Sequence, residues 1–272
     1  MVRARTRHEG QACTIEDWLR VFEDATGRDL TQFKRWYDEA GIPRLQVSDR
    51  WEDGRYTLTF RQENPATPGQ PVKGAKVIPV AVGLLNPNGD EVMPTTLCEV
   101  TESEQSFTFE GLAARPVPSI LRGFSAPVIL ERAATPEERA FLLAHDTDPF
   151  NKWEAGRTLA KEVLARMVTE GAAPGPAWLD ALAAVAFDPS LDPAFRALAL
   201  RLPGEDDLAQ TLHDAGHVPD PLAIRAARER AAQAVEVRPA RGLPAPVHGL
   251  REPRPFPPCA GFMAGPMAGP VP

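Results

Sequence analysis

Apolar residues near the start of the chain recur at the spacing of a helix. Trp18, Leu19 and Phe22 fall on one helical face, and Thr14 with Asp17 forms a capping-box signal just before that face. These positions predict an amphipathic helix that begins next to Thr14. Aromatic residues at this spacing are typical of core packing.

A second apolar face follows after a short break. Phe33, Trp36 and Tyr37 recur at positions i, i+3 and i+4. Asp29 is a candidate cap for the start of this segment, and Gly41 is a candidate stop. Together the two faces predict a helical hairpin, which is the first of four zones along the chain.

In the second zone, from Leu45 to Arg132, the period changes to that of a strand. Apolar side chains that alternate with polar ones are found at Tyr56, Leu58, Phe60, Phe107 and Phe109. The continuous apolar run from Val77 to Leu85 predicts a strand that is buried on both faces. We expect the alternating side chains to point into one core.

Turn signals divide this second zone into short strands. Asn86 to Gly89 ends in Asn-Gly, which favours a hairpin turn. Phe124 to Leu130 predicts a late strand, and Pro127 within it indicates an edge strand or a bulge. Six or seven short strands in so short a span predict an immunoglobulin-like β-sandwich. Only Cys98 lies in this span, so the likeness to an immunoglobulin domain concerns architecture alone.

The third zone, residues 134–236, is predicted to be all-helical. Four helix starts share one device, a capping side chain followed by proline at the first helical position. These starts are Thr135–Pro136, Asp148–Pro149, Asp192–Pro193 and Asp220–Pro221. Short amphipathic helices with short links predict a repeat-like array of stacked helices rather than one bundle.

The fourth zone, residues 237–272, differs in composition from the rest. It is dominated by Pro, Gly, Arg and Ala, and it ends in a repeated Met-Ala-Gly-Pro. Such a segment has too little apolar surface to offset the entropy lost on ordering it. We predict that it is disordered, and a reading-frame change is one explanation for its composition.

Composition excludes several classes of protein. The net charge of −7, with acids and bases interspersed, is unlike the basic footprint of a nucleic-acid binder. No apolar run approaches the roughly 18 residues that a membrane helix needs, and no apolar segment follows the basic N-terminus as in a signal peptide. Cys13, Cys98 and Cys259 are odd in number and far apart, which favours a reducing compartment over a disulfide framework.

The best candidate for a metal site is the pair His213 and His217. Histidines at i and i+4 share a helical face, as they do in zinc peptidases. However, Gly216 lies inside this motif and no third ligand is indicated, so we interpret the pair as a helix end at the surface. His8–Glu9 begins like a zinc motif, but position 12 is Ala12 and the second histidine is missing.

Other catalytic constellations are not found in the sequence. No serine lies in a G-x-S-x-G elbow, and no glycine-rich loop follows a strand to hold a phosphate. Glu205, Asp206 and Asp207 follow Pro203–Gly204 and are interpreted as the acidic first turn of a helix rather than as catalytic carboxylates. We therefore expect no catalytic, metal-binding or substrate-binding residue in this chain.

Several phrases of the sequence, in order, resemble the bacterial aminopeptidase N family. The phrases are His8–Ala12, Phe22–Ala25, Phe33–Tyr37, Pro65–Gln70, Ile78–Val80, Phe124–Val128, Asp148–Ala155, Leu202–Glu205, Asp220–Ile224 and Ala227–Glu229. Their number, order and spacing make the combination specific. The resemblance runs from about Arg7 to about Glu236.

The resemblance implies a domain plan for the chain. Residues 1–43 would be the last helices of a truncated catalytic domain, and residues 44–133 a β-sandwich domain. Residues 134–236 would be the first helices of a C-terminal helical domain. The missing catalytic domain would pack on Trp18, Phe22, Phe33 and Trp36.

The resemblance also implies a function for the parent enzyme. It would be a cytoplasmic, zinc-dependent peptidase that releases N-terminal residues from peptides. The family's zinc motif, glutamate ligand, substrate loop and catalytic tyrosine all lie upstream of the matching region, so this chain is expected to bind no zinc and to be inactive by itself. The alternative is a non-catalytic interaction module built from a β-sandwich and helical repeats.

Overall fold

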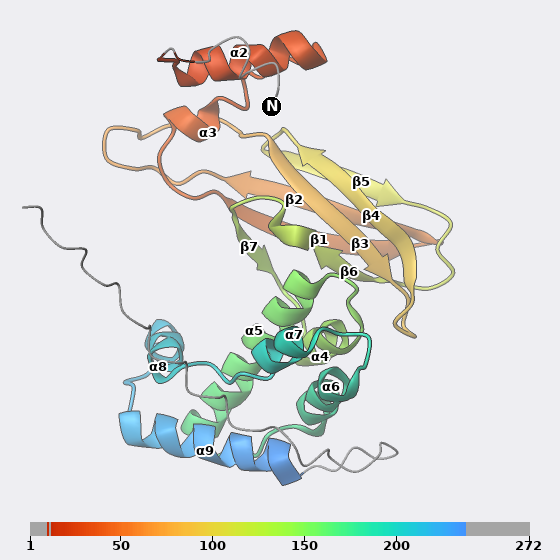
Figure 1. The fold of residues 1–272 in the computed structure, drawn as a ribbon, viewed down its shortest axis with the longest axis vertical. Coiled ribbons are helices and arrows are strands. Elements are labelled where there is room, and N and C mark those ends of the chain that lie inside the picture. Colours follow the sequence, from red (N-terminus) through yellow and green to blue (C-terminus); the bar gives the residue numbers. More distant parts are fainter. Residues whose placement is uncertain (1–9, 11, 238–272) are drawn as a thin grey trace, which may run out of the picture. The chain divides into compact units, whose positions relative to one another are not determined.

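In the computed structural model of the chain, residue 10 and residues 12–237 are described (Figure 1). Two helices at the N-terminal side are α2 (Ile15–Thr26) and α3 (Arg35–Asp38). The strands are β1 (Arg44–Glu52), β2 (Arg55–Glu63), β3 (Ile78–Leu85), β4 (Glu91–Val100), β5 (Glu104–Phe109), β6 (Val117–Ile120) and β7 (Ile129–Arg132). The later helices are the 3₁₀ helix η1 (Arg122–Phe124) and α4 (Pro136–His145), α5 (Pro149–Thr169), α6 (Pro176–Phe187), α7 (Pro193–Ala199), α8 (Glu205–Asp214) and α9 (Pro221–Val237). The predicted order of hairpin, sandwich and helical array is confirmed, and the predicted disordered tail lies outside the described residues except for Val237, the last residue of α9.

The first arm of the hairpin has the predicted cap. The Thr14 hydroxyl accepts a hydrogen bond from the Asp17 N–H, and the Asp17 carboxylate accepts one from the Thr14 N–H, which closes the capping box. Gly27 ends α2 in the left-handed conformation, with φ of 71°. This conformation favours glycine because it has no Cβ.

The second arm is shorter than the sequence predicts, since α3 is a single turn. The Asp29 carboxylate accepts a hydrogen bond from the Thr31 N–H and holds a turn instead of capping a helix. The side chains of Gln32 and Arg35 then donate to the carbonyl of Ala75 in the loop between β2 and β3. These long-range contacts hold the segment in place of further helical turns.

The seven strands form two sheets that enclose one core. The sheet orders are β5-β2-β1-β7 and β4-β3-β6. β1 and β2 pair antiparallel, with Val47 opposite Phe60, while β7 pairs in parallel with β1. Tyr56, Leu58 and Phe60 are fully buried, as predicted, and Phe107 and Phe109 pack partly buried against the same core. Full burial of one such side chain contributes about 1.5–3 kcal/mol to stability.

The remaining strand predictions are mostly confirmed. β3 occupies the middle of its sheet and is buried along nearly its whole length, as its apolar run predicts. Asn86 to Gly89 forms the turn between β3 and β4. The strand predicted over Phe124 to Leu130 is displaced, because η1 ends at Phe124 and β7 starts only at Ile129. Leu121 and Phe124 both have positive φ here, so the chain turns before it enters the edge strand.

The loop between β2 and β3 fastens the N-terminal segment to the sandwich. Trp36 packs against the sandwich core, and its indole N–H donates to the carbonyl of Val77 over 2.7 Å. The ammonium of Lys76 lies 5.2 Å from the centre of the Trp36 ring and donates to the carbonyls of Arg35 and Glu39. Residues 28–43 are therefore bonded to the sandwich and do not only precede it.

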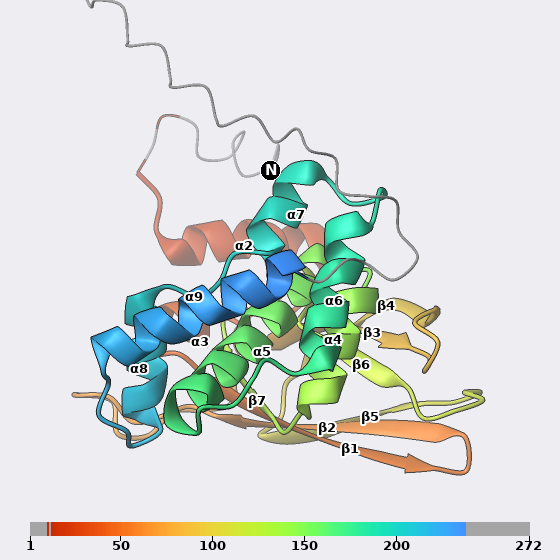
Figure 2. The same cartoon turned by 90° about the horizontal axis from the view of Figure 1, so that it is seen from below.

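The predicted caps start the helices of the array. Asp148 and Asp192 accept hydrogen bonds from the N–H groups of the first helical turn, as does Thr135. Asp220 accepts them from Leu222 and Ala223 at the start of α9. In Figure 2, α5 lies beneath α9 and beside α4 and α6. Apolar side chains from α4 to α9 share one core, which includes the fully buried Leu143, Leu164 and Leu208.

None of the helices that the structure describes is both long enough and apolar enough to span a lipid bilayer.

Candidate functional site

The histidine pair His213 and His217 lies at the end of α8 and just beyond it. α8 ends at Asp214, so His213 lies in its last turn and His217 lies beyond Gly216, which has φ of 83°. Both histidines are exposed, and the nearest charged group to the His213 ring is the carboxylate of the adjacent Asp214. The interpretation as a helix end at the surface is confirmed.

The described part of the chain offers no fitting ligand set for zinc, the metal that the resemblance implies for the parent enzyme. Within residue 10 and residues 12–237, no three His, Cys, Asp or Glu side chains are grouped so that they could hold a metal ion. A catalytic zinc needs three protein ligands and one open position for water. His8–Glu9 lies outside the described residues.

The other candidate groups have structural environments. Cys98 is buried in the sandwich core, and burial raises the pKa of its thiol to about 11, while Cys13 is exposed. Cys259 lies outside the described residues. Glu205, Asp206 and Asp207 form the first turn of α8, as predicted, and Asp207 pairs with Arg157 over 2.7 Å. The three acidic residues therefore form a helix start, and one of them also forms an ion pair.

One group of aromatic side chains is exposed on α2 and α3. The ring centre of Trp18 lies 4.5 Å from that of Phe22 and 6.5 Å from that of Tyr37, and Phe33 lies 6.2 Å from Tyr37. We call these four residues the aromatic face. Trp18 is 40% exposed and Tyr37 is 46% exposed, while Phe22 and Phe33 are half-buried. Exposed apolar patches of this kind mark interaction surfaces.

The expectation that a missing domain would cover Trp36 is wrong, because the sandwich of this chain covers it. Its indole packs on the sandwich core and hydrogen-bonds to Val77, so it faces inward. Tyr37 takes its place in the exposed group. The helical spacing predicts that Phe33, Trp36 and Tyr37 share one face. Because α3 is only a single turn, the neighbouring loop contacts Trp36 and leaves Tyr37 exposed.

A buried arginine joins the sandwich to the helical array. Arg122, in η1, is 5% exposed, and its guanidinium donates to Ser119 over 2.9 Å, to Glu91 over 2.9 Å and to Asp146 over 3.2 Å. Asp146 follows α4, whereas Glu91 begins β4. We call this set the Arg122 network. A Cβ atom at Gly83 would overlap the guanidinium, so the close approach requires glycine there.

Neighbouring hydrogen bonds strengthen this junction. The Asn151 amide, on α5, donates to the carbonyl of Ile120 over 2.9 Å, and the N–H of Gly123 donates to Asp148 over 3.0 Å. Burial raises the pKa of Asp146, while the Thr147 hydroxyl, with further help from Arg122, lowers the pKa of Glu91. Sequence reasoning missed the Arg122 network, because a buried charge leaves no periodic signal in the sequence.

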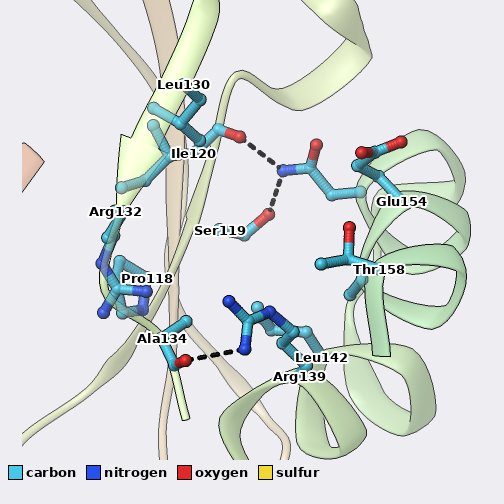
Figure 3. A pocket seen from close by; sticks show the side chains of 12 residues that line it. Pro118, Ser119, Ile120, Leu130, Arg132, Ala134, Arg139, Leu142, Glu154 and Thr158 are labelled. Atoms are coloured by element: carbon cyan, nitrogen blue, oxygen red, sulfur yellow. Dashed lines mark hydrogen bonds between the residues drawn. The ribbon is translucent and has the colours of Figure 1, made fainter. Parts of the chain in front are cut away.

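A pocket of about 210 Å³ lies beside the junction, between β6 and β7 on one side and α4 and α5 on the other (Figure 3). Its lining residues are Pro118, Ser119, Ile120, Leu130, Arg132, Ala134, Arg139, Leu142, Asn151, Glu154, Ala155 and Thr158. The wall is mainly apolar, with charged side chains at its margin. A pocket of this volume can enclose only a small ligand.

Comparison with known proteins assigns both halves of the fold. Residues 41–133 match a domain of unknown function, DUF3458, described as having an Ig-like fold. Residues 136–264 match its C-terminal companion, DUF3458_C, described as ARM repeats. These descriptions confirm the immunoglobulin-like sandwich and the repeat-like helical array. The second match continues beyond the described residues, into the segment that composition predicts to be disordered.

The chain is similar over most of its length to two curated aminopeptidases. Aminopeptidase N of Escherichia coli is 36% identical over 238 residues, which cover 82% of this chain. Aminopeptidase N of Caulobacter vibrioides is 38% identical over 229 residues and covers the same share. The chain is a homologue of aminopeptidase N. It spans 27% and 26% of the lengths of these two relatives, about a quarter of each.

A solved structure agrees with this homology. The crystal structure of Legionella pneumophila aminopeptidase A in complex with aspartic acid superimposes with a TM-score of 0.72 at 29% identity. The match covers 85% of this chain and 26% of that one. The common fold therefore extends over most of this chain.

Proposed function

We propose that this chain supplies scaffold domains of a zinc-dependent, cytoplasmic aminopeptidase that releases N-terminal residues from peptides. Homology to aminopeptidase N over four-fifths of the chain supports the peptidase. Among the described residues no side chains are grouped so that they could hold a metal, which supports assigning the chemistry to the part of the relatives outside the match.

The aromatic face is the observation that favours a scaffold role. Trp18 and Tyr37 are large, largely apolar and exposed, and they are held on a segment that is fastened to the sandwich through Trp36 and Lys76. A helix with one apolar stripe requires a partner to bury it. We propose that the catalytic domain is this partner.

Two assays on the chain as it stands test its inactivity. We expect neither stoichiometric zinc in purified protein nor release of the anilide from an aminoacyl anilide. Stoichiometric zinc together with chelator-sensitive release would contradict the proposal. A His213→Ala and His217→Ala double variant would then show whether the discounted pair holds the metal.

A binding assay tests the scaffold role. The probe is the part of the Escherichia coli relative outside the match, and Trp18→Ser should weaken its binding at least about tenfold, since a central aromatic anchor is worth 2 kcal/mol or more. Leu97→Ser is the matched control, because Leu97 is 62% exposed on β4 and lies outside the aromatic face. Equal loss in both variants, or no binding by the unmodified chain, would favour the interaction-module alternative.

A further inference from the structure

The outer edge of β7 lies in the pocket beside the junction. β7 is the last strand of its sheet, and the N–H of Ile129 donates to the carbonyl of Pro43 over 2.9 Å, next to β1. In a parallel pair, alternate residues turn their backbone groups toward the neighbouring strand, so Ile129 and Glu131 bond to β1. The N–H and C=O groups of Leu130 and Arg132 therefore point away from β1.

These outward backbone groups have no hydrogen-bond partner among the residues that the structure describes. Leu130 and Arg132 both line the pocket, and α4 and α5 form its opposite side (Figure 3). The edge is within reach of solvent, because Leu130 is 37% exposed. A strand edge with unpaired groups is a template for one more strand.

The edge of β6, which lines the same pocket, already has a partner. The side-chain amide of Asn151, on α5, donates to the carbonyl of Ile120 over 2.9 Å and to the hydroxyl of Ser119 over 2.8 Å. Pro118 has no N–H to offer. A side chain thus takes the place of a further strand at β6, and in the described part of the chain β7 has no such substitute.

The pocket also offers an apolar surface for a side chain. Leu130 is opposite Leu45 in the register of β7 and β1, and Leu45 is fully buried in the sandwich core. Side chains at opposite positions lie on the same face of a sheet, so Leu130 faces inward. Leu142 and Ala155 line the same pocket from α4 and α5. A strand added to β7 would therefore turn every second side chain toward an apolar wall.

We propose that the edge of β7 binds an extended peptide segment as an added strand of its sheet. The peptide would exchange backbone hydrogen bonds with Leu130 and Arg132, whose outward groups repeat about every 7 Å, as those of a second strand do. Its sequence would alternate, with small apolar side chains toward Leu142 and Ala155 and polar ones toward solvent. The pocket volume of about 210 Å³ is the reason for small side chains. This binding is independent of the proposed function, because the strand edge and the pocket belong to this chain alone.

Titration of the isotope-labelled chain with acetyl-Val-Thr-Val-Thr-amide, followed by NMR, tests the proposal. We expect saturable shifts and slower hydrogen exchange at the amides of Leu130 and Arg132. The amides of Ile129 and Glu131 are internal controls, because they already bond to β1. Half-saturation should occur below about 5 mM peptide. No saturable shift up to about 20 mM, or saturable shifts that leave Leu130 and Arg132 unchanged, would overturn the proposal.

A change in the peptide separates backbone pairing from side-chain contacts. The same peptide with every backbone nitrogen methylated keeps its side chains but has no N–H to donate. We expect it to bind at least about tenfold more weakly. Equal binding of the two peptides would refute an added strand.

A change in the protein locates the binding on β7. Leu130→Pro removes one outward N–H but none of the bonds to β1, so it should weaken peptide binding at least about tenfold. Leu130→Val keeps the N–H and should change binding less than about threefold. Circular dichroism checks that both variants fold, and if the proline variant does not, the methylated peptide still decides. Equal binding to a folded Leu130→Pro variant would place the peptide elsewhere and refute the inference.

Sedimentation of the chain without peptide tests whether a second copy occupies the edge instead. We expect a monomer in both the unmodified chain and Leu130→Pro. A dimer that Leu130→Pro converts to a monomer would show that β7 pairs with a second copy, and the peptide proposal would then be wrong.

Discussion

The side chain of Arg122 connects the sandwich to the helical array. It is buried and donates to groups on β4, on β6 and after α4. Arg122→Ala would leave the fully buried Asp146 without its cation, in a site where water cannot replace it. We expect a loss of about 3–5 kcal/mol in the free energy of unfolding, measured by urea denaturation.

Arg115→Ala is the matched control for this prediction. Arg115 pairs with Asp49 over 2.7 Å, but its side chain is 62% exposed, so its loss should cost less than about 1 kcal/mol. A loss of similar size in both variants would mean that the Arg122 network contributes no more than a surface ion pair.

At the residue scale, the sequence predicts side chains that obey a local rule. Thr14 and Asp148 were predicted as caps, and both accept the expected backbone hydrogen bonds. Lys76 and Arg122 gave no such signal, because their partners are distant in sequence. A glycine that lets a buried side chain approach the backbone closely, as Gly83 does for Arg122, is the one trace of such a residue in the sequence. A single sequence does not show which of its glycines allow such an approach.

At the element scale, α3 and the loop after β2 stabilise each other. A truncation of residues 1–27 keeps the contacts of Trp36 and Lys76, whereas a truncation of residues 1–41 removes the carbonyls of Arg35 and Glu39 to which Lys76 donates. We expect the longer truncation to cost about 2–4 kcal/mol more in stability, because it removes the Trp36 indole from the sandwich core and leaves the carbonyl of Val77 without its donor. Thermal unfolding followed by far-UV circular dichroism measures the difference.

Lys76→Met in the longer truncation separates the charge from the packing. Because the longer truncation also exposes the Lys76 ammonium to water, we expect the loss to come from packing and this substitution to restore little of it. Two truncations of equal stability would show that residues 28–41 contribute nothing to the sandwich.

Elements were predictable where hydrophobic period and capping agree. The helices after Thr135, Asp148 and Asp192 began where expected, and the alternation over β2 identified the inward side chains. The second arm of the hairpin and the strand expected from Phe124 were wrong in extent. In both cases distant hydrogen bonds compete with the local preference, and sequence spacing does not contain them.

At the scale of the whole molecule, the junction should respond to acid through Glu91. The Thr147 hydroxyl and Arg122 hold the pKa of Glu91 below its usual value of 4.5. A lowered carboxyl pKa gives stability that is complete above pH 4.5 and is lost as the pH falls through the folded-state pKa. The stability difference between the unmodified chain and Glu91→Gln should therefore be present at pH 7 and shrink below pH 4.5.

Urea unfolding at several pH values measures this difference. Glu137→Gln is the control, because Glu137 is an exposed acid in the first turn of α4, outside the Arg122 network. A difference for Glu91→Gln that stays constant from pH 7 to pH 3 would exclude the ion pair as its source. The order of the zones was predictable from the sequence, but this coupling between them was not, since it depends on four elements meeting at one guanidinium.

The parallel pairing of β7 with β1 has a consequence for synthesis on the ribosome. β1 emerges among the first strands, but its neighbour on one side is the last strand of the sandwich. The β1–β2 hairpin can form early, whereas the flank of β1 stays uncovered until β7 has left the exit tunnel, with the helices following directly behind it. The nascent chain therefore carries an open strand edge for most of the time that the domain is being made, and chaperones would be expected to act there.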